Sequence, residues 1–256
     1  MEMGNGIELE EDTWQFSQAA AHFDEHIKQS VPNCEEQRKY VAALARFFLH
    51  QDGRAYELGV STGRTAEAVL ARMPGRKIQY IGLDLEPEMV AKARVNLAGD
   101  PRFIAACANV LDYAFEPAAL VISYYTFQFL PPVRRPKLLR RLWETLEPGG
   151  ALVVYEKTLG SDPKVQCIFS EIYHEFKAQQ GLSADAILNK ERSLQGVAQP
   201  MTLEENFAQL RNAGFETVEI IFRSFCFAGF LAVKDRQPGA GSERAILAPS
   251  SGAGHG

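Results

Sequence analysis

The sequence predicts a Rossmann-like α/β fold whose mostly parallel sheet ends in an antiparallel strand. Three observations predict it. Short apolar segments alternate with amphipathic ones, a glycine-spaced turn follows the first apolar segment, and an acidic residue ends the second. The 256 residues suffice for one domain with a sizeable core. We therefore expect one α/β core that carries N-terminal lid helices and a helical insertion.

Two helices are expected ahead of the sheet. Apolar residues recur at three- and four-residue spacing over residues 14–29 and 34–50, and a Ser-Val-Pro-Asn segment separates the two stretches. The first dozen residues are acidic and contain glycine, so we expect them to be mobile. Residues 1–52 are thus predicted to be a tail followed by lid helices that cover a ligand.

The core is expected at residues 53–159. A strand over residues 54–60, a helix from about Arg64 and a second strand ending at Asp84 form a βαβ unit. The further elements expected in the core are a helix at 87–97, strands at 103–108 and 120–126, a helix at 133–146 and a strand at 151–158. A Glu-Pro-Gly-Gly segment before this last strand predicts a sharp reversal of the chain.

The remaining residues predict an insertion, a closing hairpin and a tail. Residues 160–202 are polar and mostly helical, and their length indicates an insertion beside the site that selects the substrate. Residues 203–235 complete the core. The elements expected there are a helix at 203–213, capped by the glycine after it, and an antiparallel pair of strands at 217–226 and 228–234. The composition of residues 236–256 predicts a disordered tail.

Composition and charge disfavour several classes of function. The net charge is −5 and the basic residues are scattered, so no nucleic-acid surface is predicted. There is neither a signal peptide nor a long apolar span, so we expect no membrane partner. The four cysteines are widely spaced without a C-x-x-C motif, which favours a reduced cytoplasmic location.

The turn after the first strand indicates the kind of cofactor. Gly59 and Gly63 remain of the dinucleotide pattern G-x-G-x-x-G, and Ser61 stands at its middle position. Glu57 ends the strand, where an anion would repel a phosphate but suit an ammonium group. Asp84 is placed to bond ribose hydroxyls. The cofactor implied is a nucleoside that carries positive charge, as S-adenosylmethionine does.

This pattern, E-x-G-x-x-x-G followed by an acid at the end of the next strand, resembles the class I S-adenosylmethionine-dependent methyltransferases. Across nearly the whole ordered chain, the sequence is similar to the carboxy-S-adenosylmethionine synthase family. That family moves the carboxyl group of prephenate onto the methyl group of S-adenosylmethionine. The matching stretches are residues 14–16, 27–32, 128–130, 147–153, 156–157, 174–177, 192–193 and 212–215. The resemblance implies a class I methyltransferase sheet and a homodimer.

The pattern and the resemblance together give the expected site. The cofactor-binding residues are expected to be Glu57, Gly59, Val60, Ser61, Gly63, Asp84, Leu85, Met89, Asn109, Val110 and Tyr124. Leu85 and Met89 would line the adenine pocket. By resemblance, Arg192 would meet a substrate carboxylate through a bidentate pair, so we expect a small carboxylate-bearing substrate. The expected product is S-adenosylhomocysteine or methylthioadenosine.

Three positions depart from the family. Cys34 replaces a tyrosine, Tyr124 an asparagine and Asn109 an aspartate. The Asn109 amide can still bond the adenine edge. Tyr124 lies at the tip of the fourth strand, where an aromatic face would stabilise a sulfonium, so Tyr124 and Arg192 are the candidate catalytic residues. Strand alternation predicts that only one of Tyr124 and Tyr125 points there.

Four functions follow from these residues. The simplest is methyl transfer to a small molecule, and the family resemblance adds carboxy-S-adenosylmethionine synthesis from prephenate. In a third reaction, the amino group of the cofactor attacks its own γ-carbon to form azetidine-2-carboxylate and methylthioadenosine. The fourth is a non-catalytic sensor. His174 is a candidate base or substrate contact, whereas His22 and His26 lack a third ligand and predict no metal site.

Overall fold

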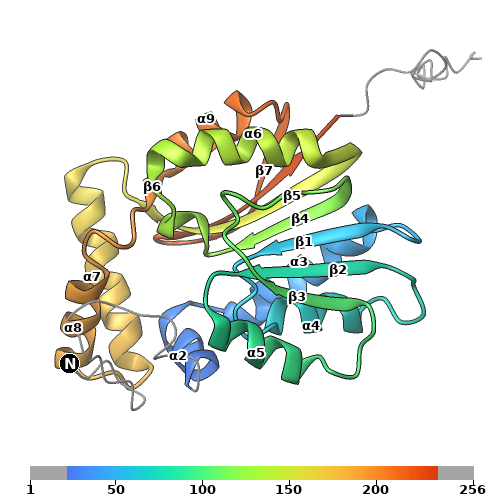
Figure 1. The fold of residues 1–256 in the computed structure, drawn as a ribbon. Helices are drawn as coiled ribbons and strands as arrows, with labels where there is room; N and C mark the ends of the chain where they lie inside the picture. The colour runs from blue at the N-terminus through green and yellow to red at the C-terminus, as the bar shows by residue number, and fades with distance from the viewer. Residues whose placement is uncertain (1–21, 236–256) are drawn as a thin grey trace, which may run out of the picture.

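The computed structural model describes residues 22–235, which form one central sheet with helices on both faces (Figure 1). The strands are β1 (Arg54–Leu58), β2 (Gln79–Asp84), β3 (Phe103–Cys107), β4 (Ala118–Tyr124), β5 (Leu146–Leu159), β6 (Met201–Thr202), β7 (Thr217–Ser224) and β8 (Phe227–Val233). Their order is β3-β2-β1-β4-β5-β8-β7, and the short β6 pairs with β5. Strands β1 to β5 pair in parallel, and β8 runs antiparallel to β5 and β7. The predicted fold class is confirmed.

Two apolar clusters sandwich the sheet. The helices are α2 (Phe23–Ser30), α3 (Cys34–Phe48), α4 (Arg64–Ala71), α5 (Pro87–Asn96), α6 (Arg135–Thr145), α7 (Pro163–Gln179), α8 (Ala184–Leu194) and α9 (Leu203–Asn212), with 3-10 turns at Phe127–Phe129 and Pro132–Arg134. Leu120 and Ile122 of β4 pack with α3, α4 and α5, whereas Val121 packs with α6 and α9 on the opposite face. This alternation is the period-2 pattern of a strand buried on both faces.

The segment predicted to be a helical insertion holds α7 and α8. Asp162 caps α7 by accepting from the backbone N–H groups of Lys164 and Val165, and Ser183 caps α8 by accepting from Ala186 N–H. In Figure 1 these two helices and α2 lie at the side of the sheet toward which the parallel strands point. They are therefore placed to enclose a site at the carboxyl ends of the strands.

The helix α2 is tied to the turn after β1. Asp24 accepts hydrogen bonds from the Thr62 hydroxyl and, at 2.7 Å, from Arg64 Nε. Residues 14–21 of the first predicted helix and both predicted tails lie outside the described residues. Within residues 22–235, no helix has the length and apolar character needed to cross a membrane.

The Glu-Pro-Gly-Gly segment belongs to β5, so the chain reverses at the end of α6, at Leu146, and not at this segment as predicted. Leu146 pairs with Ala118, and the next pair joins Ala151 to Leu120, so the residues between them bulge out of the ladder. The bulge stays in the sheet because Lys234 O accepts from Gly149 N–H and Lys234 N–H donates to Gly150 O. These two bonds come from a residue far away in the sequence.

Candidate active site

A cavity of about 720 Å³ lies at the carboxyl ends of β1, β2 and β4 and is also lined by α2, α3, α7 and α8. The strand order reverses between β1 and β4, which is where open α/β sheets bind ligands. Every predicted cofactor-binding residue except Gly63 lines this cavity, and so does Arg192. The predicted residues in the lining are Glu57, Gly59, Val60, Ser61, Asp84, Leu85, Met89, Asn109, Val110, Tyr124 and Arg192.

The two glycines of the turn have different surroundings. Gly59 has a φ of 70°, and a Cβ there would lie 2.3 Å from Thr126 Oγ1, whose hydroxyl donates to Leu58 O at 2.7 Å. Gly63 precedes α4 with a φ of 84°, and a Cβ there would lie 2.8 Å from a Leu97 methyl carbon. The absence of a side chain at Gly59 thus lets Thr126 lie against the turn inside the site. Gly63 allows the left-handed conformation that starts α4 and the close packing of Leu97.

Asp84 and Asn109 organise the predicted nucleoside end. The Asp84 carboxylate accepts from Ser61 N–H at 2.8 Å and Glu86 N–H at 3.0 Å, and each of its oxygens keeps acceptor capacity for a ribose hydroxyl. Burial raises the pKa of Asp84. Asn109 Oδ1 accepts from Leu111 N–H at 3.0 Å. Its amide nitrogen is then suited to donate to a ring nitrogen of adenine.

Glu57 is buried, and its surroundings favour the neutral carboxyl over the anion expected from the sequence. Its side chain is 1% exposed and accepts from the Tyr80 hydroxyl at 2.8 Å. Burial raises the pKa of Glu57 to about 8, because the ionised form loses its hydration. An ammonium group beside this carboxyl would favour its ionised form and lower that pKa.

Arg38 is a site residue that the sequence did not reveal. It lies on α3 and lines the cavity, and its buried Nε has no hydrogen-bond partner among the described residues. Its charge favours ionisation of Glu57. Arg38 and Glu57 therefore fit the carboxylate and ammonium groups of an amino acid such as the methionine end of S-adenosylmethionine. The only hint in the sequence was that Arg38 follows Cys34 by four residues, which places the two on the same face of a helix.

Both Tyr124 and Tyr125 line the cavity, and both hydroxyls donate to Gln37, so strand alternation does not send the two side chains to opposite faces. That only one of them faces the sulfonium stays a prediction. Strand alternation stops because β4 ends at Tyr124 and Tyr125 has a φ of 62°, a rare conformation for an aromatic residue. The two rings meet edge to face with their centroids 4.8 Å apart. Burial raises the pKa of both phenols, so both stay protonated.

The far end of the cavity carries positive charge. Two ammonium groups lie over the ring of Tyr173 on α7, with Lys157 Nζ at 4.6 Å and Lys177 Nζ at 4.4 Å from its centroid. Lys177 is 1% exposed, and burial lowers its pKa to about 8, although Glu191 lies 3.6 Å from its Nζ. Arg192, on the last turn of α8, is an exposed part of the same lining.

The lysines were missed as site residues although they fall in stretches that carry the family resemblance. Tyr173 and Lys177 are four apart on α7, so they share a face of that helix. Lys157 comes from β5, and only the fold brings it to Tyr173. The spacing on α7 was therefore the available signal.

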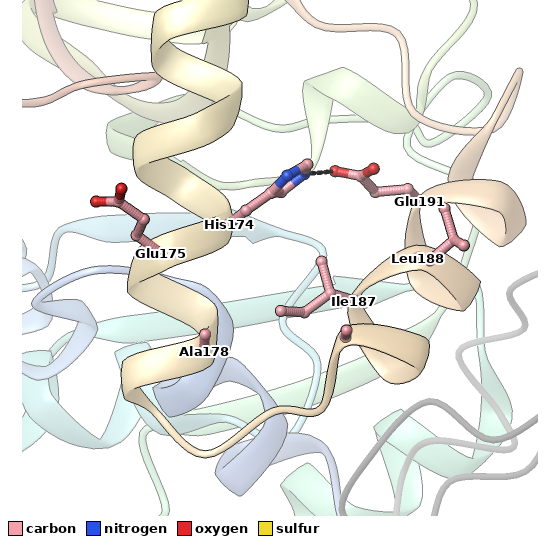
Figure 2. Close-up of a pocket in the computed structure, with 7 residues that line it drawn as sticks. His174, Glu175, Ala178, Ile187, Leu188 and Glu191 are labelled. Carbon is pink, nitrogen blue, oxygen red and sulfur yellow. Dashed lines mark hydrogen bonds and ion pairs between the residues drawn. The ribbon is translucent and has the colours of Figure 1, made fainter.

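The two histidines on α2 and α7 are placed differently: His26 lines the main cavity, and His174 does not. Figure 2 shows His174 pointing from α7 to Glu191 of α8, across a shallow second pocket that Ala178 and Ile187 also line. His26 is buried and contacts Lys190 Nζ. No group of three potential metal ligands occurs in the described part of the chain.

Comparisons with known proteins indicate the same family as the sequence motifs. Residues 55–150 match the family model of the methyltransferase domain. The carboxy-S-adenosyl-L-methionine synthase of Staphylococcus epidermidis is 32% identical over 222 residues, which cover 87% of this chain and 96% of the relative. The synthase of Desulfotalea psychrophila is 34% identical over 216 residues, 83% of this chain and 88% of the relative. The predicted resemblance is confirmed.

Solved structures share the fold. Haemonchus contortus phosphoethanolamine N-methyltransferase 2 in complex with S-adenosyl-L-methionine has a TM-score of 0.61 at 17% identity, covering 88% of this chain and 61% of that one. Human N-acetylserotonin methyltransferase in complex with the same molecule has a TM-score of 0.60 at 18% identity, covering 86% and 56%. At such identities the likeness supports the Rossmann-like methyltransferase fold alone.

Proposed function

The chain belongs to the carboxy-S-adenosyl-L-methionine synthase family, within the class I methyltransferase fold, and from this membership we propose an S-adenosylmethionine-dependent transfer that involves a small carboxylate-bearing molecule. S-adenosylmethionine is the cofactor, and its sulfonium supplies the activated carbon. One observation carries the proposal: a single cavity joins an end that suits this cofactor to an end lined by lysines. A volume of about 720 Å³ lies within the range of small-molecule sites.

The cofactor end is assigned residue by residue. Asp84 would hold the ribose hydroxyls, and Asn109 the adenine edge. Glu57 and Arg38 would hold the ammonium and carboxylate groups of the methionine portion. This arrangement would place the sulfonium between the nucleoside and the amino acid, near Tyr124. The orphaned Arg38 Nε supports the assignment, because a buried polar atom without a partner is costly unless a ligand satisfies it.

The lysine end suits an anionic second substrate. Lys157 and Lys177 lie over the ring of Tyr173, and burial lowers the pKa of Lys177, so a bound carboxylate would stabilise the charged ammonium form. Arg192 at the rim would add a bidentate partner. Prephenate carries two carboxylates, and the relatives bear the name carboxy-S-adenosyl-L-methionine synthase. Carboxyl transfer from prephenate is therefore the first specific reaction to test, ahead of methyl transfer to another carboxylate.

The two tyrosines favour a second candidate, cyclisation of the cofactor itself. In this reaction, the amino nitrogen bonds to the γ-carbon, the bond from that carbon to sulfur breaks and a proton leaves the nitrogen. The products are azetidine-2-carboxylate and methylthioadenosine. Two aromatic walls at Tyr124 and Tyr125 would exclude water from the sulfonium. The lysine end has no role in this reaction, so the first proposal accounts for more of the cavity.

Mass spectrometry of the products tests both candidates. The purified chain is incubated with S-adenosylmethionine alone and then with prephenate. The proposal expects a prephenate-dependent cofactor product heavier by the mass of carbon dioxide. Methylthioadenosine without prephenate would establish cyclisation instead. An unchanged cofactor with prephenate and with a panel of small carboxylates would contradict both and favour a sensor.

Two finer expectations accompany the proposal. The family membership supports a homodimer, which analytical ultracentrifugation would detect as twice the 28.4 kDa chain mass. The cytoplasmic location also stays a prediction, supported by the widely spaced cysteines, all four of which are free thiols in the structure.

A further inference from the structure

We propose that Gln37 is a positioning residue: through the hydroxyls of Tyr124 and Tyr125, it holds two aromatic rings against the sulfonium. The proposal rests on the proposed function, because it requires S-adenosylmethionine in the cavity beside these rings. Gln37 itself is absent from the cavity lining and acts through its two partners.

The Gln37 amide has a single orientation that satisfies its neighbours. Its Nε2 donates to Pro32 O at 2.7 Å, and its Oε1 accepts from the hydroxyls of Tyr124 and Tyr125, each at 2.9 Å. A flipped amide would turn its NH₂ group toward the hydroxyls and its oxygen toward the Pro32 carbonyl, which cannot donate. The amide oxygen therefore faces both tyrosines.

The hydroxyl protons of both tyrosines consequently point toward Gln37 on α3. Tyr124 has a second acceptor at 3.1 Å, Cys34 O, which also belongs to the start of α3, so either bond directs its proton toward that helix. The phenols remain neutral, because burial raises the pKa of each. The ring electrons are thus the groups that these residues offer a cation.

Gln37 also fixes where the two rings lie. A ring can swing about its Cα–Cβ bond unless its far end is held, and here both far ends meet on one oxygen. The two rings meet edge to face at 74°. Tyr125 reaches this position only through its left-handed backbone, so its hydroxyl bond supports an otherwise strained residue.

Packing in the core does not by itself require a glutamine at position 37. Gln37 is 0% exposed, and the buried residues that follow it on α3 are Val41, Ala42 and Ala45. A buried amide destabilises a fold unless its hydrogen bonds are made, whereas an aliphatic residue would pack there without that requirement. The three bonds to Pro32 and the tyrosines supply the reason.

The test compares a charged and an uncharged form of the same ligand. Calorimetry measures the affinities of S-adenosylmethionine and of S-adenosylhomocysteine, which lacks the sulfonium charge. We expect Gln37→Leu to weaken S-adenosylmethionine binding by about tenfold and S-adenosylhomocysteine binding by less than about threefold. Tyr124→Phe combined with Tyr125→Phe retains both rings but not their anchors, and the same selective loss is expected. Adding Gln37→Leu to this double variant should cause no further loss, because all three changes remove one interaction.

Other results would overturn the proposal. Equal losses for the two ligands, or losses that add up in the triple variant, would make Gln37 a general structural residue. If Gln37→Leu does not fold, the tyrosine variants decide alone: an unchanged preference for the sulfonium would refute the anchoring role. If the unaltered chain binds neither ligand, the proposed function fails as well, which separates the two failures.

Discussion

At the scale of single residues, the protonation of Glu57 should make the stability of the protein and its binding of ligand depend on pH. The pKa of Glu57 is about 8 in the folded protein against an ordinary value of 4.5, and Glu156 shows the same shift through burial. A folded state that keeps a proton released by the unfolded state loses stability as pH rises. These two carboxyls should therefore contribute a fall in the free energy of unfolding without ligand from about pH 4.5 to about pH 8.

Glu57→Gln should make this fall shallower, because one of the two titrating groups is gone. Urea unfolding at several pH values between about 5 and about 8 measures the slope. Glu36→Gln, at an exposed carboxylate on α3, is the matched control and should leave the slope unchanged. A slope that Glu57→Gln does not alter would show that Glu57 is ionised in the folded protein.

Ligand binding should release this proton. Near pH 6.5 Glu57 should be protonated in the free protein, and the ammonium group of S-adenosylmethionine would favour its ionised form. Calorimetry in buffers of different ionisation enthalpy should detect up to about one proton released, and none from Glu57 in Glu57→Gln. Equal proton release by both proteins would place the ammonium group elsewhere.

Gly59 offers a test of the close contact in the turn. Gly59→Ala would place a Cβ 2.3 Å from Thr126 Oγ1, in addition to the strain of a positive φ. Gly75→Ala is a matched control, since Gly75 has a φ of 74° and no heavy atom within 4 Å of its added Cβ. We expect Gly75→Ala to cost only the strain, about 1 kcal/mol, and Gly59→Ala to cost more and to weaken cofactor binding. Equal melting temperatures for the two variants would contradict the contact.

At the scale of elements, α2 is attached to the cofactor turn by one carboxylate. Asp24→Ala removes the bonds to Thr62 and Arg64 and should release α2 from the cavity. We expect S-adenosylmethionine to dissociate about three- to tenfold faster, a modest change because the ion pair is partly exposed. Glu67→Ala removes the other partner of Arg64, on α4, and should leave dissociation unchanged. Stopped-flow measurement of dissociation decides, and equal rates in all three proteins would mean that α2 does not cover the ligand.

The helix α7 should govern the second substrate. Lys177→Met removes a buried ammonium group that lies over the ring of Tyr173, whereas Lys164→Met changes an exposed lysine near the start of the same helix. We expect the affinity for prephenate to fall about tenfold or more in the first variant only, with binding of S-adenosylmethionine retained. Unaltered affinity for prephenate in Lys177→Met would remove the main support for an anionic substrate.

At the scale of the whole molecule, the sequence predicted the order of elements well because local rules determine it. Alternating apolar and amphipathic segments indicated the parallel core, and the terminal strands were expected as an antiparallel pair. The bulge in β5 was missed, since it is held by bonds to Lys234. The side by side placement of Tyr124 and Tyr125 was also missed, because a left-handed residue after a strand breaks the period-2 rule.

The site residues were predictable where they directly follow a parallel strand. The predicted cofactor residues after β1, β2 and β3 reach one cavity, because the carboxyl ends of parallel strands share an edge of the sheet. Arg38 and Lys157 could not be predicted in the same way. One lies on a helix before the sheet and the other near the end of β5, so their place in the site depends on tertiary packing.

A crystal structure with S-adenosylhomocysteine bound would show directly where the cofactor lies in the cavity. We expect the ribose on Asp84, the amino-acid end between Glu57 and Arg38, the sulfur beside Tyr124, and free space left beside Lys157 and Lys177. Electron density for the ligand outside this cavity, or with its amino acid in the lysine end, would contradict the account.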